Sequence, residues 1–130
     1  MKLEYLKLIM LAAVADGKIQ EQELSLIARI KSNHAELKEI PEEQTQEAMA
    51  DIYNKLSAGM EVTHILELLG RQFDETQRHA AYALAKEVCA SDFEVGPAET
   101  DFLRLLETEW NIPAKVCKSI DLSIQLRYFT

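Results

Sequence analysis

Apolar residues recur at intervals of three and four along almost the whole chain, and this spacing predicts amphipathic helices. No stretch alternates apolar and polar residues for long enough to predict a strand. The pattern therefore predicts an all-α fold, a single compact bundle of about seven helices. Five of these helices are expected over residues 2–15, 20–33, 41–58, 62–72 and 74–90, and two more are expected to begin at Pro97 and Pro113.

Residues that begin or end helices delimit these segments. Asp74 is a good N-cap, because its short carboxylate accepts hydrogen bonds from free backbone N–H groups. Pro41 suits the first position of a helix, and Glu42 and Glu43 behind it suit the positive end of the helix dipole. Gly17 suits the left-handed conformation that closes a helix.

Two of the predicted helices are apolar nearly all round, at Leu8–Ala15 and Ala80–Cys89. A helix that is apolar on every side belongs inside the core. Their small residues also allow two helix axes to approach closely. We therefore expect the first and fifth helices to pack against each other at the centre of the bundle.

The chain contains an internal repeat. Asp16 and Glu23 recur at one common offset as Asp92 and Glu99, each pair following an Ala-rich helix, and Ile40-Pro41 recurs at a slightly smaller offset as Ile112-Pro113. Each half thus consists of an Ala-rich helix, an acidic turn, an amphipathic helix, an Ile-Pro pair and a further helix. We expect one domain over residues 1–130, with halves at about 1–58 and 74–130 and a connector at about 59–73.

The first acidic turn, Ala-Val-Ala-Asp-Gly-x-Ile-x-x-x-Glu-Leu over residues 13–24, and its degenerate copy at 90–99 carry a resemblance to a known family. The chain resembles the TerB-like family, which is named for tellurite-resistance proteins and is related to the N-terminal domain of a DnaJ-type co-chaperone. This resemblance implies a helical bundle with duplicated halves and acidic residues that bind divalent metal. It also implies an association with tellurite resistance and the stress response.

The acidic turns share the spacing of the second half of an EF-hand calcium loop. They are not EF-hands, because Ala12 and Val14 stand where the first two side-chain ligands would be. Two carboxylates with water and a carbonyl oxygen can still hold Ca²⁺ or Mg²⁺ weakly. The predicted metal ligands are Asp16, Glu23, Asp92 and Glu99. Simple helix capping by the same carboxylates is the alternative reading, and the sequence leaves open whether the two turns meet in space.

Charge, apolar runs and cysteine content limit the classes of partner and the cellular compartment that we expect. The chain has 14 Lys and Arg against 22 Asp and Glu, a net charge of −8, which disfavours nucleic acid because phosphate binding depends on Lys and Arg. The longest apolar run, Leu8–Ala15, is too short to span a membrane, and no cleavage-like region follows it, so we expect no signal peptide. We expect a cytoplasmic protein that is not integral to a membrane, with Cys89 and Cys117 as buried, reduced thiols.

No arrangement of residues suggests catalysis. The chain has no Gly-rich phosphate loop and no nucleophile with a recognisable base, and His34, His64 and His79 are expected at the surface or its boundary. The sequence therefore predicts a non-enzymatic, stress-associated domain that binds Ca²⁺ or Mg²⁺ through its acidic turns, with no certain cofactor.

The alternative function is a protein–protein interaction module that needs no metal. It would use an acidic face or the apolar C-terminal end, which is formed by Trp110, Ile112, Tyr128 and Phe129. Its partner would be an unidentified protein, including one in a complex at the membrane periphery. Docking of this apolar end into the core is the simpler expectation, and the oligomeric state stays open.

Overall fold

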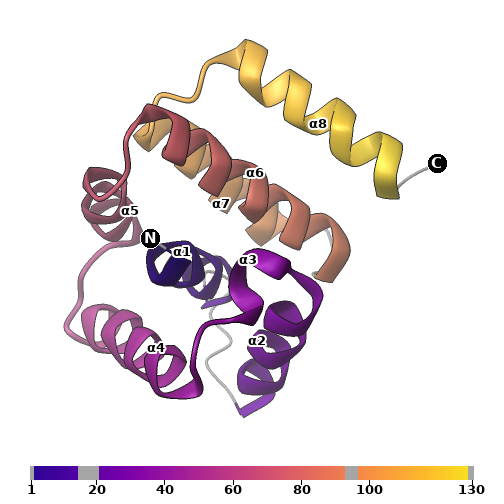
Figure 1. The fold of residues 1–130 in the computed structure, drawn as a ribbon. Coiled ribbons are helices and arrows are strands. Elements are labelled where there is room, and N and C mark those ends of the chain that lie inside the picture. The colour runs from indigo at the N-terminus through magenta and orange to yellow at the C-terminus, as the bar shows by residue number, and fades with distance from the viewer. Residues whose placement is uncertain (1, 15–20, 93–96, 129–130) are drawn as a thin grey trace.

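The computed structural model describes residues 2–14, 21–92 and 97–128, and within these ranges it contains eight helices and no strand. This confirms the predicted all-α class. The helices are α1 (Lys2–Val14), α2 (Glu21–Asn33), α3 (Ala35–Lys38), α4 (Glu42–Ser57), α5 (Val62–Arg71), α6 (Glu75–Asp92), α7 (Pro97–Glu109) and α8 (Ala114–Tyr128) (Figure 1).

Seven of these helices lie where the apolar spacing predicts them. Asp74 caps α6 as expected: Asp74 Oδ1 accepts from the backbone N–H of Gln77 and Gln77 Oε1 accepts from that of Asp74, both at 2.8 Å. The reciprocal pair satisfies two otherwise free donors. The sequence predicts Pro41 at the first position of its helix. In the structure Pro41 has an extended backbone, with ψ at 148°, and occupies the N-cap position before α4.

The eighth helix, α3, explains a break in the repeat. The second helix of each half has 13 residues, and α7 begins and ends at the same offset from α2 that separates the two acidic pairs. The Ile-Pro pairs that follow are separated by a smaller offset. The four residues of α3 lie between α2 and the Ile-Pro pair in the first half, and the second half runs from α7 to Pro113 without such a helix. The change of offset is therefore the length of α3.

The centre of the bundle is α1, which packs against α3, α4, α5 and α6 (Figure 1). Five of its side chains are at most 2% exposed: Leu6, Leu8, Ile9, Met10 and Leu11. The partner helix α6 buries Ala81, Tyr82, Ala85 and Val88 completely. The two apolar helices thus contact each other in the core, as their composition predicts. The last helix, α8, lies along α6 at the outer edge of the bundle (Figure 1).

The end of α7 is fastened to α5 by an aromatic side chain. Trp110 is 6% exposed, and its Nε1–H donates to the Leu66 carbonyl at 2.8 Å. Its ring meets Phe73 edge-on, with centroids 5.6 Å apart. Ile112 is also buried, which confirms the expected docking for this part of the apolar end. The side chains of Tyr128 and Phe129 lie outside the described part.

Gly70 allows this close packing, because a Cβ atom there would lie 2.7 Å from Trp110 Nε1. Gly70→Ala should therefore lower the free energy of unfolding by about 1–3 kcal/mol, as overpacked cores do. Helix propensity alone predicts the opposite sign. Urea denaturation of both proteins measures the change.

A double-mutant cycle with Trp110→Phe supplies the control. Phenylalanine lacks the indole nitrogen, so the Gly70→Ala change should cost less in that background. A gain in stability from Gly70→Ala alone, or the same cost in both backgrounds, would contradict the packing argument.

Candidate functional site

The structure places the predicted metal ligands only by their backbone. Asp92 is the last residue of α6, and Glu23 and Glu99 are each the third residue of their helices, α2 and α7. Asp16 belongs to residues 15–20, outside the described ranges. Each predicted pair thus belongs to the junction between an Ala-rich helix and the amphipathic helix after it. A shared ion between the two junctions stays a prediction.

The described side chains do not assemble another metal centre. Among them, no three His, Cys, Asp or Glu residues lie close enough to hold an ion together. The surface location expected for His34 is wrong, because this residue is only 6% exposed. It forms the corner between α2 and α3, where its carbonyl accepts from the N–H groups of Leu37 and Lys38. Trp110 is a buried ring at the matching corner of the second half, so the repeat explains the burial.

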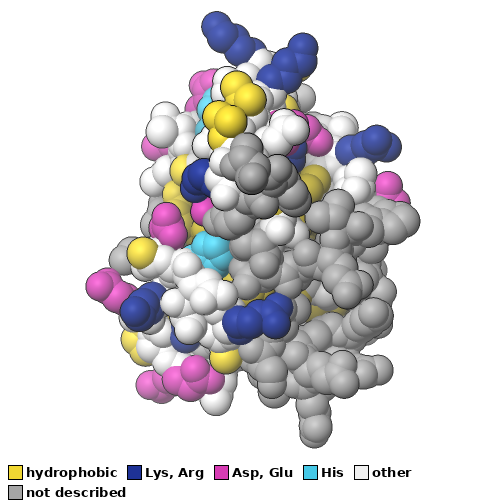
Figure 2. Space-filling model, turned by 90° about the vertical axis from the view of Figure 1, so that its right-hand side faces the viewer, with side chains coloured by type: hydrophobic (Ala, Val, Ile, Leu, Met, Phe, Trp, Pro, Cys, Tyr) yellow, Lys and Arg dark blue, Asp and Glu magenta, His cyan; other side chains and the backbone are white. Residues whose placement is uncertain are grey.

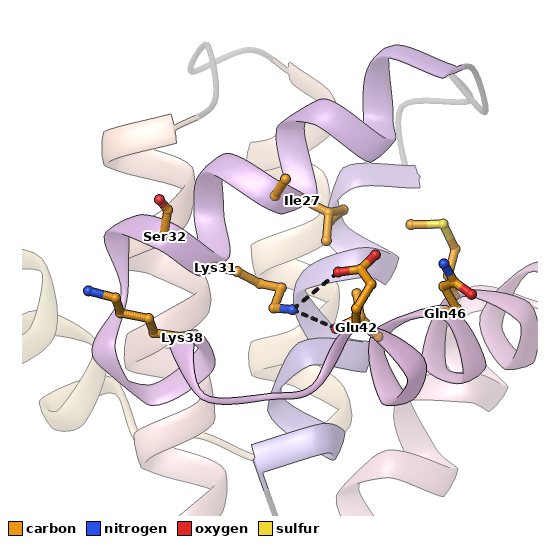
Figure 3. Close-up of a pocket in the computed structure, with 9 residues that line it drawn as sticks. Ile27, Lys31, Ser32, Lys38, Glu42 and Gln46 are labelled. Atoms are coloured by element: carbon orange, nitrogen blue, oxygen red, sulfur yellow. Dashed lines mark hydrogen bonds and ion pairs between the residues drawn. The ribbon is translucent and has the colours of Figure 1, made fainter.

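A pocket of about 480 Å³ opens between α2 and α4 (Figure 3). Its volume falls within the usual range for small-molecule sites. The walls combine apolar and polar side chains, and α3 contributes one of them: Ile27, Ala28, Lys31, Ser32, Lys38, Glu42, Thr45, Gln46 and Met49. No pattern in the sequence pointed to this pocket, because its walls come from helices that periodicity alone does not pair.

Lys31 is a polar group of the pocket that hydrogen bonds hold in place. Its side chain is 12% exposed, and its ammonium donates to the Ile40 carbonyl at 2.9 Å and to Thr45 Oγ1 at 2.7 Å. The Thr45 hydroxyl in turn donates to the Pro41 carbonyl at 3.1 Å. Glu42 Oε2 lies 3.8 Å from the ammonium on a side chain that is 76% exposed. Lys31 therefore ties α2 to the beginning of α4.

The second half holds a different polar cluster at the matching place. Glu107 matches Lys31 at the offset of the acidic pairs, and Cys117 matches Thr45 at the offset of the Ile-Pro pairs. Between them α6 inserts Tyr82, which is completely buried, and Lys86, which pairs with Asp121 of α8. The Tyr82 hydroxyl lies beside Glu107 and Cys117 but has no hydrogen-bond partner among the described groups.

The electrostatics of this cluster favour the protonated forms of the Tyr82 hydroxyl and the Cys117 thiol. Burial raises the pKa of Tyr82 above its ordinary value, and the neighbouring Cys117 and Glu107 raise it further. Burial likewise raises the pKa of the Cys117 thiol. Burial lowers the pKa of Lys86, and the charge of Glu107 opposes that shift. A protonated, buried thiol is a poor nucleophile. Both cysteines are buried and outside any disulfide, as expected.

Comparisons with known proteins give one match. The family model described as tellurite resistance protein TerB matches residues 2–122, nearly the whole chain. Searches of curated proteins and of solved structures returned no match. None of the helices described combines the length and apolar character that crossing a membrane requires.

The raised pKa of Tyr82 predicts a loss of stability at alkaline pH. In the unfolded chain a tyrosine ionises near pH 10, whereas Tyr82 stays protonated in the fold. The unfolded state then binds fewer protons, so the free energy of unfolding falls by about 1 kcal/mol for each pH unit above 10. Tyr82→Phe should remove the part of this decrease in the free energy of unfolding that Tyr82 causes. Urea denaturation at pH 8, 10 and 11 measures it.

At pH 8 the same variant should be within about 1 kcal/mol of the parent, because it gives up no hydrogen bond. Tyr53→Phe is the matched control, since it removes an exposed hydroxyl from a ring that is 47% exposed. Equal alkaline losses in Tyr82→Phe and the parent would contradict the prediction.

Proposed function

Because the chain belongs to the TerB family, we propose that it acts as a non-enzymatic domain in tellurite resistance and the stress response, and that it binds a divalent cation through its two acidic turns. The proposed ligands are Asp16, Glu23, Asp92 and Glu99. Ca²⁺ and Mg²⁺ are the expected ions, because both prefer oxygen ligands.

The observation that carries this proposal is the agreement between the sequence repeat and the helix positions. In the sequence, one acidic pair follows or closes each of α1 and α6, the two helices that contact each other in the core. The two glutamates occupy the same position, the third residue, in two helices of equal length. The helix framework thus gives the two glutamates equivalent backbone settings.

The polar groups that the structure describes favour binding over catalysis. Lys31 is held by neutral acceptors on α4 and before it, and Cys117 is a buried thiol with a raised pKa. Neither arrangement joins a nucleophile to a base. We therefore assign the domain a binding role.

Isothermal titration calorimetry of the full chain with Ca²⁺, Mg²⁺ and Zn²⁺ tests the metal proposal. We expect binding of Ca²⁺ or Mg²⁺ with a dissociation constant of about 10⁻⁴–10⁻³ M, the range of sites with few charged ligands. Asp16→Ala should weaken it about tenfold or more, because a charged ligand is lost.

Glu47→Ala is the control, because it removes an exposed carboxylate from the middle of α4. Absence of heat above dilution at millimolar metal, with Asp16→Ala equally silent, would refute the proposal.

One observation favours the alternative, a protein–protein interaction module, and it concerns exposed leucines of α8 in place of the buried Trp110 and Ile112. Leu122 and Leu126 of α8 are 58% and 60% exposed. The residues of α4 that match them in the repeat are the exposed Ala50 and Asn54. The repeat thus directs these positions outward in both halves, and only α8 carries leucines there. Figure 2 shows apolar and basic side chains side by side at the top of the molecule, where α8 lies.

The double variant Leu122→Ser and Leu126→Ser tests this alternative. It should leave the melting temperature unchanged, because both side chains are exposed, and it should abolish capture of a protein partner in a pull-down. Ala50→Ser, at the matching position of α4, is the control and should retain capture. Capture that survives the double variant but disappears with EDTA would favour the metal-dependent function instead.

A further inference from the structure

Among the described side chains, none from the central helix α1 gives the ammonium of Lys31 a counter-charge, whereas the second half has one at the matching place. There, the carboxylate of Glu107 is faced by the ammonium of Lys86 from the central helix α6. The residue of α1 that matches Lys86 is Met10, which is apolar and 2% exposed. The first half therefore holds a nearly buried cation with no charged partner from its own central helix.

Glu42 offers Lys31 only weak compensation. Its carboxylate oxygen is 3.8 Å from the ammonium, outside hydrogen-bond distance, on a side chain that is 76% exposed. Pairs of this kind contribute little to stability. An ammonium has three donors, and two of them are used by Ile40 and Thr45. Figure 3 shows this ammonium pointing from α2 towards Glu42, at the pocket.

We propose that this pocket binds a small carboxylate with a short apolar chain. The ligand carboxylate accepts the third hydrogen bond of Lys31 and takes the place of Glu42. The apolar chain lies against the aliphatic side of the pocket, where Ile27 is 3% exposed and Met49 is half-buried. Lys38 adds a second positive charge to the wall, in a chain whose net charge is −8.

The charge of the site favours a carboxylate over a phosphate. The ammonium of Lys31, which two neutral acceptors hold in place, balances a single negative charge, whereas Lys38 is an exposed residue at the wall. A phosphate dianion would keep a second charge beside Glu42, without the forked guanidinium donors that usually bind it. The pocket offers no arginine among its lining residues.

Titration of the ¹⁵N-labelled full chain with hexanoate, in the presence of EDTA, tests the proposal and does not depend on the metal sites. We expect saturable amide shifts centred on Ala28, Lys31, Thr45 and Gln46. Hexanol, which has a similar chain without the charge, should bind about tenfold more weakly or worse, because a hydrogen bond to a charged group is lost. Inorganic phosphate should not displace hexanoate.

Two variants separate binding from folding. Lys31→Met should weaken hexanoate about tenfold or more. Glu42→Gln, a change at an exposed side chain, should tighten binding about two- to fivefold, because the competing carboxylate is neutralised. Lys118→Met, which removes an exposed ammonium from α8, should leave binding unchanged.

Three outcomes would overturn the proposal. These are equal affinity for hexanol and hexanoate, displacement of hexanoate by phosphate, and no gain in affinity from Glu42→Gln. The last result is informative even if Lys31→Met fails to fold, because the side chain of Glu42 is 76% exposed and its substitution by glutamine should leave the fold intact.

Discussion

Burial of α1 is the constraint on which the rest of the structure depends. Nearly every side chain of this helix from Leu6 to Ala13 is buried, so it needs neighbours on all sides. The other helices supply them: α4 and α6 pack along it, and α3 and α5 cover what remains. Because α6 is its repeat partner, contact between the two central helices also joins the two halves of the chain. The acidic junctions follow α1 and α6 in the sequence. The packing of these two helices therefore fixes where each junction begins.

Much of this framework could be predicted from the sequence, because helix periodicity and capping are local properties. The reciprocal capping of α6 by Asp74 and Gln77 depends on residues three apart, and the burial of α1 follows from its composition. The helix α3 escaped prediction because four residues are too few to show a period. His34 was misplaced for a related reason: its burial comes from the corner between two helices, which its own residue type does not indicate.

The polar groups were harder to predict, because each depends on helices far apart in the chain. Lys31 resembles any lysine of an amphipathic helix until α4 brings Thr45 and the Ile40 carbonyl to it. The same holds for Tyr82, whose surroundings come from α7 and α8. The acidic turns differ from these polar groups, because the sequence makes their predicted ligands prominent. The structure describes only the backbone of Glu23, Asp92 and Glu99.

The repeat allows matching positions in the two halves of one molecule to be compared. The two halves place matching helices around a central helix and put opposite charges at one position, Lys31 in one half and Glu107 in the other. In the second half, Lys86 from the central helix faces that charge and also pairs with Asp121. In the first half, apolar Met10 stands at the position that matches Lys86, and among the described residues the exposed Glu42 is the acidic partner of Lys31. A buried charge without a buried partner is costly, and an anion that enters the pocket would lower that cost. Duplication of the fold thus allows the two halves to differ: Glu107 faces a cation from the central helix, whereas Lys31 has the charge that the proposed carboxylate would compensate.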